Sequence, residues 1–203
     1  SGTVGNGSYT LTTSTAGGND LVFSLGDINV AVSYTVGLAG QDQRGNLDLN
    51  TIYTGGTIDV CWQKAESSSE EPAMEAAVIY KESTSGFYKI WRGAYDPSPT
   101  RRAGNFFSNT DSGTCANLTN KKTLNLSSLL GKKIALRLRP FYVRATLSVA
   151  PLTGNNLPSQ GLTISSVGTA GQTTRKVVVT QSYSSLPSIF DYVATSKIVN
   201  PTT

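Results

Sequence analysis

Hydrophobic and polar residues alternate over short segments along most of this chain. In the clearest case, Ile134, Leu136 and Leu138 alternate with residues 135, 137 and 139. A period of two is typical of a β-strand that buries one face. Similar patterns predict strands at residues 21–25, 30–34, 47–53, 57–62, 74–80, 87–91 and 144–149.

The last third of the chain adds a hairpin. β-Branched runs at residues 162–167 and 175–181 flank a glycine-containing loop at residues 168–173. Such runs around a glycine-rich loop are a hairpin signal. With this hairpin the chain has about ten short strands at the spacing of a sandwich. We therefore predict an all-β fold with β-sandwich-like antiparallel sheets and a C-terminal hairpin.

Signals for helix are sparse. Residues 66–77 have a helix-favouring composition, but Pro72 interrupts them, and we predict an exposed loop with a charged tip at residues 67–72. Residues 124–130 are expected to form a helical turn that Gly131 ends. Residues 93–120 contain two prolines and three glycines and show little strand signal. Loops of this length are uncommon in a compact domain unless they are functional or tethered. We expect any partner-facing surface at residues 66–71 and 93–120, the alternative being decorated loops without a partner.

The 203 residues, 38% of them apolar, suffice for one packed domain. We predict a single extracellular β head domain over residues 1–203. An alternative division places a sandwich at residues 1–140 and a C-terminal sheet at residues 141–203. We prefer one domain because the strands predicted on either side of Pro140 are only a few residues apart.

Cys61 and Cys115, the only cysteines, are 54 positions apart. A zinc site needs more ligands and a redox motif needs adjacent cysteines, so we predict a disulfide, with two buried free thiols as the alternative. Closing a loop of this length stabilises a fold by about 4 kcal/mol in the chain-entropy model. The disulfide would indicate an oxidising compartment, which favours an extracellular location.

The net charge of +4 is spread over the chain, with basic pairs at residues 101–102, 121–122, 132–133 and 175–176. A solvated surface is the simplest interpretation. Binding of DNA or another polyanion is the alternative, because positive charge attracts polyanions. No row of aromatic residues accompanies these charges, which weakens the case for DNA.

Composition narrows the catalytic options. The chain has no histidine, so the commonest general base and metal ligand are both missing. We predict no catalytic, cofactor-binding or metal-binding residue and no enzymatic activity. Two alternatives are a glycosidase that uses two carboxylates among Asp48, Asp59 and Glu75, and a calcium loop around Gly45. The oxygen-bearing side chains of that loop are Asp42, Asn46, Asp48 and Asn50.

Six aromatic residues between positions 62 and 95 are dense enough to suggest a surface for glycan stacking. They are Trp62, Tyr80, Phe87, Tyr88, Trp91 and Tyr95. Aromatic residues on strands are more often core residues or cross-strand pairs, so carbohydrate binding is the alternative interpretation.

Two segments resemble type IV pilin-like surface proteins. Residues 132–149, KKIALRLRPFYVRATLSV, are similar to a segment that precedes the tail in minor pilin-like proteins. The tail hairpin followed by residues 186–193, LPSIFDYV, is similar to the end of their globular heads. The resemblance covers residues 130–193, and residues 194–197 depart from the Gly/Ser-rich finish that is more usual.

The resemblance implies a filament subunit or minor pilus subunit that acts by assembly and adhesion at the cell surface. Its partners would be other pilus subunits or cell-surface components, and its only membrane contact an N-terminal apolar helix that the chain lacks. The resemblance also implies that Ile189, Phe190, Tyr192 and Val193 pack the final segment against the sheet. A free-standing β-sandwich adhesin or carbohydrate-binding module is the alternative.

Overall fold

The computed structural model describes residues 1–16, 23–42, 44 and 46–183, and nearly all of them are β. The strands of the first half are β1 (Gly2–Val4), β2 (Gly7–Ala16), β3 (Phe23–Ile28), β4 (Tyr34–Gly37), β5 (Ala39–Gln41), β6 (Leu47–Ile52), β7 (Thr57–Lys64), β8 (Ala73–Glu82) and β9 (Tyr88–Tyr95). After them come α1 (Pro99–Asn105), β10 (Asn120–Asn125), β11 (Gly131–Phe141), β12 (Ala145–Pro151), β13 (Gly161–Ala170) and β14 (Thr173–Ser182).

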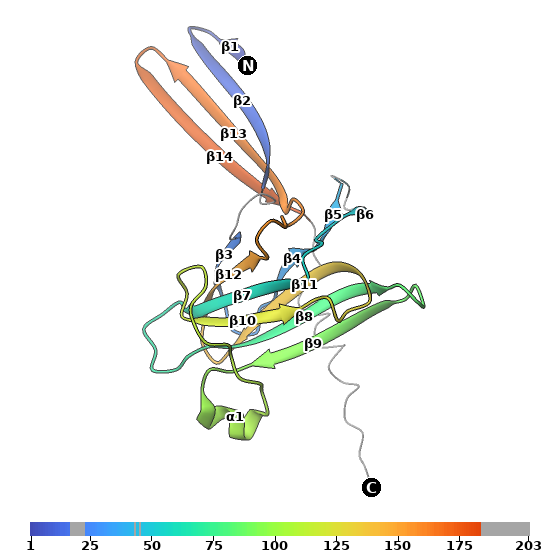
Figure 1. Cartoon of the computed structure of the whole chain (residues 1–203). Coiled ribbons are helices and arrows are strands. Elements are labelled where there is room, and N and C mark those ends of the chain that lie inside the picture. The colour runs from blue at the N-terminus through green and yellow to red at the C-terminus, as the bar shows by residue number, and fades with distance from the viewer. Residues whose placement is uncertain (17–22, 43, 45, 184–203) are drawn as a thin grey trace.

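Two antiparallel four-stranded sheets form a sandwich (Figure 1). One sheet has the strand order β10-β7-β12-β3 and the other has the order β4-β11-β8-β9. A short pair, β5 and β6, lies at one end of the sandwich. The predicted all-β fold with sandwich-like antiparallel sheets is therefore confirmed.

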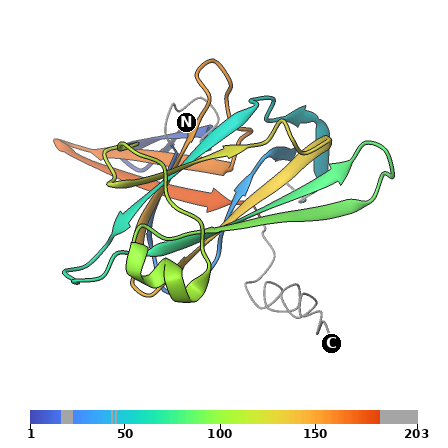
Figure 2. The ribbon, with the colours of Figure 1, turned by 60° about the horizontal axis from the view of Figure 1, so that its bottom comes forward.

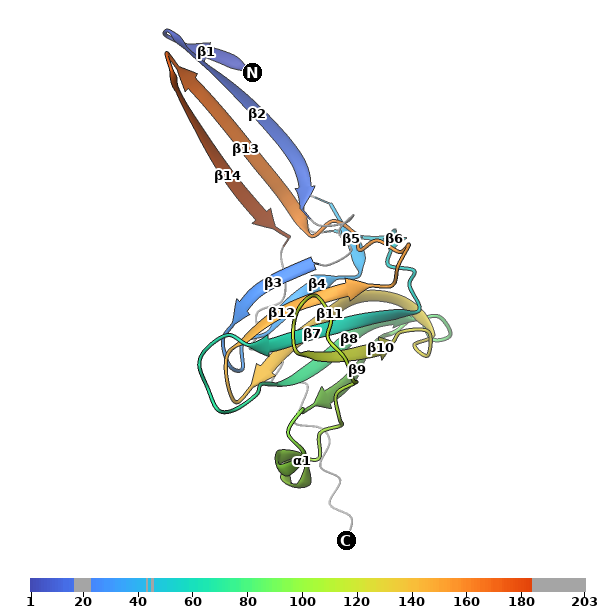
Figure 3. The same ribbon diagram turned by 60° about the vertical axis from the view of Figure 1, so that its left-hand side comes forward.

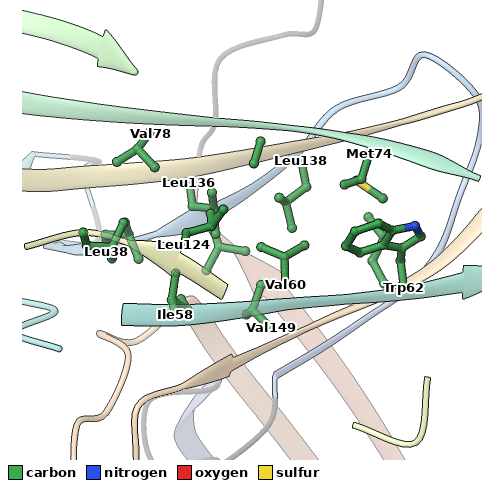
Figure 4. Close-up of a cluster of buried hydrophobic side chains, with 14 of the residues drawn as sticks. Leu38, Ile58, Val60, Trp62, Met74, Val78, Leu124, Leu136, Leu138 and Val149 are labelled. Carbon is green, nitrogen blue, oxygen red and sulfur yellow. The ribbon is translucent and has the colours of Figure 1, made fainter. Parts of the chain in front are cut away.

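The core lies between the two sheets (Figure 4). Ile58, Val60 and Trp62 alternate along β7 and point toward Leu136 and Leu138 of β11. All five side chains are fully buried, because a period of two puts every second residue on the inner face. The buried Trp62 also satisfies its polar group, since its Nε1–H donates to the carbonyl oxygen of Pro72 at 2.8 Å.

The predicted disulfide is confirmed. It joins Cys61 on the outer side of β7 to Cys115 in the long connection between β9 and β10. This connection also contains α1, a helix that the sequence does not predict. Ser98 caps the helix and Pro99 occupies its first turn, yet the helix buries none of its residues, so no apolar period revealed it.

The C-terminal hairpin is present, but it does not belong to the sandwich. β13 and β14 join β1 and β2 in a separate sheet of order β1-β2-β13-β14, which we call the blade. The blade projects from one end of the sandwich, and α1 lies at the opposite end (Figures 1 and 3). Figure 2 brings the α1 end forward and shows the blade behind the sandwich.

One side chain fixes the blade to the sandwich. Gln160 lies immediately before β13, and its side-chain amide bonds twice to Gly37 of β4: the oxygen accepts from the backbone N–H at 2.7 Å, and the NH2 group donates to the backbone carbonyl oxygen at 2.9 Å. The backbone carbonyl oxygen of Gln160 accepts from the N–H of Tyr183, immediately after β14. The amide of Gln160 therefore replaces one step of backbone pairing where the blade meets β4.

One strand prediction and one helical-turn prediction need correction. Residues 30–34 are mostly a turn, because Ala31 adopts a left-handed conformation (φ 61°) and its N–H donates to the carbonyl oxygen of Pro140. Strand pairing therefore begins only at Tyr34. In the segment at residues 124–130, the first two residues end β10 and the turn follows them, and Gly131 begins β11 instead of ending a helix. β11 continues through Pro140 to Phe141.

Some predictions lie outside the described residues. These are the packing of residues 186–193 and the first two residues of the strand expected at residues 21–25. The remainder of that strand lies in β3.

Candidate interaction surface

The two faces of the blade differ in polarity. The register places Tyr9, Gly168 and Arg175 in one cross-strand row, and Leu11, Ser166 and Val177 in the next row of the same face. Partners in a row share a face, so the members of each face follow from the register. We define the apolar face by its large hydrophobic residues, which are Val4, Tyr9, Leu11, Leu162, Ile164, Val177 and Val179. The other face carries mostly Ser and Thr, with Val167, Lys176 and Val178 among them.

The apolar face is largely open to solvent. Val4 is 75% exposed and Val177 is 60% exposed, whereas Leu162 and Ile164 are half-buried. No second layer of described residues covers this face. Contiguous exposed apolar residues usually mark a surface that binds another molecule. The apolar face of the blade is therefore the strongest candidate for an interaction surface.

A hollow of about 360 Å³ lies near the tip of the blade. Val4 and Tyr9 form apolar parts of its lining, and Arg175 is its only charged residue. The hollow has space because three of the residues that line it are small: Gly7, Gly168 and Ala170. It is shallow and apolar enough to hold a protruding side chain of a partner.

Two tight turns make the tip. Gly5 and Asn6 connect β1 to β2, and Gly171 and Gln172 connect β13 to β14. The glycine comes first in each turn, with φ of 57° in both. A glycine with positive φ at the first central position is the requirement of a type II′ hairpin turn, whose twist matches that of the strands.

The blade is also purely cationic. Its four strands contain Arg175 and Lys176 but no acidic residue. The other basic pairs are placed differently. Arg101 binds Asp96, Lys121 and Lys122 lie near Asp59 and Asp111, and Lys132 donates to the carbonyl oxygen of Leu49. The blade therefore presents one cation on each of its faces, Arg175 on the apolar face and Lys176 on the other.

The loops at residues 66–71 and 93–120, where a partner-facing surface was expected, are held together by the buried carboxylate of Asp96. Asp96 is fully buried and accepts from Nε and Nη2 of Arg101, from the N–H of Ser98 and from the side-chain amide of Asn105. Arg101 also donates to the carbonyl oxygen of Glu71, so it ties α1 to the loop at residues 66–71. Burial alone would raise the pKa of Asp96, but these hydrogen bonds outweigh it and keep the pKa below its usual value.

One residue of this region is presented to solvent. Phe106 follows α1 in a left-handed conformation (φ 57°) and is 90% exposed. Its N–H donates to the carbonyl oxygen of Arg102, which ends the helix. The connection between β9 and β10 is thus mostly anchored, and Phe106 is its most exposed apolar group.

The six aromatic residues do not form one platform. Trp62 and Tyr95 are core residues, and Tyr80 and Trp91 pack against the core. Phe87 and Tyr88 alone are exposed, near the turn between β8 and β9. Their side chains offer two rings at most for stacking on a sugar.

The three candidate carboxylates lie in three different sheets. Asp48 is on β6, where it accepts from the N–H of Asn50 and the hydroxyl of Thr51. Asp59 on β7 accepts from the hydroxyl of Thr123. Glu75 on β8 binds Arg92 at 2.6 Å and Arg139 at 2.5 Å. The structure therefore does not bring these acids together as a pair.

The oxygen-rich loop bonds mainly to itself. Asp42 accepts from the N–H groups of Arg44 and Asn46 and from the side-chain amide of Asn46. Within the described part of the chain, no three acidic or cysteine side chains gather in a group that could hold a metal ion.

Comparison with known proteins gives no relative. No family model matches the chain, and neither does any curated protein or solved structure. Over the described ranges, no helix has the length and apolar character needed to cross a membrane. The functional interpretation therefore depends on the residues and on the geometry above.

The sequence interpretation missed the blade as a surface because it missed β1 and β2. A signal was present, since Gly5-Asn6 is a hairpin dipeptide between short β-branched runs. Tyr9 and Leu11 also alternate with Ser8, Thr10 and Thr12. The polar residues that alternate with them are mostly threonines, whose methyl groups make them less polar than charged residues. The hydrophobic and polar positions of β2 therefore differ little along the sequence.

Proposed function

We propose that the chain is the globular head of a type IV pilin-like filament or minor pilus subunit. It acts outside the cell by assembly and surface contact and catalyses no reaction. One observation carries this proposal: a one-layer blade projects from the sandwich and exposes an apolar face near the N-terminus. A face of this kind gains stability only when another apolar surface covers it.

The resemblance of residues 132–149 to pilin-like proteins supports the same proposal, because these residues form part of the core. Residues 132–149 build β11 and β12, each an inner strand of its sheet. The similar segment therefore supplies much of the core, through Leu136, Leu138, Leu147 and Val149. A shared core-building segment is consistent with a shared fold, whereas surfaces diverge more readily.

The disulfide is consistent with a location outside the cytoplasm. Disulfides form and persist in oxidising compartments, which include the cell exterior and the bacterial periplasm. In this chain the Cys61–Cys115 bond fastens the long β9–β10 connection to the sandwich. A head that is displayed on a surface benefits from such a fastening, because long loops are where proteases cut.

The native gene product tests the proposal. Intact mass and peptide mapping of the protein from its own cells would show which residues precede Ser1. We expect a leader-cleaved, N-methylated start followed by an apolar helix long enough to span a membrane, roughly 20 residues or more. A conventional signal-peptide scar directly before Ser1 would contradict the proposal and favour a free-standing adhesin, for which Phe87 and Tyr88 would be tested in glycan binding.

A further inference from the structure

β14 leaves one long edge of the blade open. It is the last strand in the order β1-β2-β13-β14, and no described residue pairs with its outer side. Alternate residues of a strand direct their N–H and C=O groups away from the neighbouring strand, so β14 presents a row of them along ten residues. Three consecutive valines, Val177, Val178 and Val179, are each more than half exposed there. A long, apolar open edge is a template for one more strand.

We propose that this edge binds a second copy of the same chain, with the two β14 strands antiparallel and Val178 on the two-fold axis. A symmetric contact requires a self-complementary strand, because each residue meets its symmetry mate. β14 meets this requirement. About Val178, the sequence pairs Val177 with Val179, Arg175 with Gln181, and Thr174 with Ser182.

Charge selects this register. Centred on Val178, Lys176 lies opposite residue 180 of the second copy and Arg175 lies opposite Gln181, so no cation faces a cation. A register centred on Lys176 or Arg175 would place like charges directly opposite each other, which destabilises a strand pair. A register shifted by one residue on one strand alone would bring the apolar face of one blade beside the polar face of the other.

The pairing extends the apolar face across both molecules. Val177 and Val179 belong to that face, so their contact with the second copy joins the two apolar faces into one sheet surface. The contact is isologous and therefore closed, and it does not propagate. It depends only on the edge of β14 and not on the pilin-like assignment. In a filament it would link the heads of two neighbouring subunits or filaments instead of lengthening one.

A single introduced cysteine tests the pairing in the full chain. Both native cysteines are in the disulfide, so Val178→Cys provides the only free thiol. Cα atoms of directly opposite residues lie about 5.5 Å apart, within reach of a disulfide. Under mild oxidation, Val178→Cys is expected to give several-fold more covalent dimer than Val4→Cys, an exposed valine on β1. Equal yields from the two variants would overturn the proposal.

A mixture of two variants tests the register. Arg175→Cys and Gln181→Cys are each expected to form no covalent dimer, because each thiol lies six residues out of step with its own symmetry mate. Mixed together, they are expected to form the disulfide-linked heterodimer. Failure of the mixture, with Val178→Cys still cross-linking, would overturn this register. Sedimentation of the unmodified chain provides a check without cysteines: a reversible monomer–dimer equilibrium is expected, and a monomer at every accessible concentration would overturn the pairing itself.

Discussion

Asp96 shows how one buried side chain organises the end of the molecule farthest from the blade. Its carboxylate binds Arg101 through two nitrogens, and the guanidinium lies over the ring of Tyr142 at 4.4 Å. Asn105 links the same carboxylate to the hydroxyl of Tyr142. The turn between β11 and β12, α1 and the loop at residues 66–71 therefore share one polar centre.

Removing this charge should cost much more than removing an exposed one. Asp96→Asn leaves the Arg101 guanidinium, of which about four fifths is covered, without its carboxylate. Breaking a buried pair on one side costs about 3 kcal/mol or more. We expect urea unfolding to show a loss of this size. Glu66→Gln, an exposed acid of the neighbouring loop, should change stability little. Equal effects of the two substitutions would contradict the assigned role of Asp96.

The same group predicts acid sensitivity. The pKa of Asp96 is lowered in the folded state, so its ionised form stabilises the fold above the unfolded pKa of about 3.9. That contribution is lost as the pH falls through the lower, folded pKa. Asp111 behaves in the same way, because Lys122 and the N–H of Thr123 outweigh its burial. Melting temperatures measured below about pH 4 should fall more steeply for the native chain than for Asp96→Asn. Parallel curves would contradict this assignment.

At the scale of elements, the disulfide holds the longest connection. Replacing both Cys61 and Cys115 by serine should lower the free energy of unfolding by about 4 kcal/mol, because the unfolded chain gains the freedom of an open loop. Thermal or urea unfolding measures this change directly. A loss well below 1 kcal/mol would show that residual structure or strain cancels the effect.

Gly161 sets the base of the blade. It is a central-strand residue paired with both Ala16 and Ser182, and its φ is 157°. A Cβ at this position would collide with the carbonyl oxygen of Gln181. Gly161→Ala should therefore destabilise the blade by about 2 kcal/mol. The control, Gly168→Ala on the same strand, meets nothing within 4 Å and should be neutral or slightly stabilising. Hydrogen exchange of the β13 and β14 amides would separate the two variants, and similar protection in both would contradict this role.

Predictability from the sequence differed between elements for physical reasons. β11 was predicted because Leu136 and Leu138 alternate with charged residues. The hairpin was predicted because its valines flank a glycine turn. Residues 30–34 have the same alternation, but a left-handed Ala31 and a hydrogen bond to Pro140 make a turn there, which only the tertiary structure decides. The place of the hairpin outside the sandwich was not predictable either, since it depends on pairing with β2, some 150 residues earlier in the chain.

For the candidate site, the sequence showed which residue types are present but not which of them the fold brings together. The three carboxylates and the six aromatic residues each had a plausible sequence pattern, and the structure separates the members of both sets. Conversely, the apolar face of the blade combines residues near both ends of the chain, such as Leu11 and Val177. No local pattern reports a pairing of that separation.

At the scale of the whole molecule, the sandwich and the blade have different requirements. The sandwich buries its apolar side chains between two sheets, whereas the blade is a single layer whose apolar face no other described residues cover. A single-layer sheet is marginal in water and gains stability from packing against another element. The central claim of our account is therefore that the apolar face joins the head to its assembly.

The most direct test is assembly of the full gene product in the cells that produce it, with one row of the blade altered. Leu11→Ser with Val177→Ser changes the two apolar members of one row of the apolar face, and Thr10→Ser with Val167→Ser changes two members of the next row, on the polar face. Our account predicts that the first pair leaves the melting temperature of the head unchanged but removes the protein from surface filaments, whereas the second pair still assembles. Normal incorporation of the Leu11/Val177 variant into filaments would contradict it.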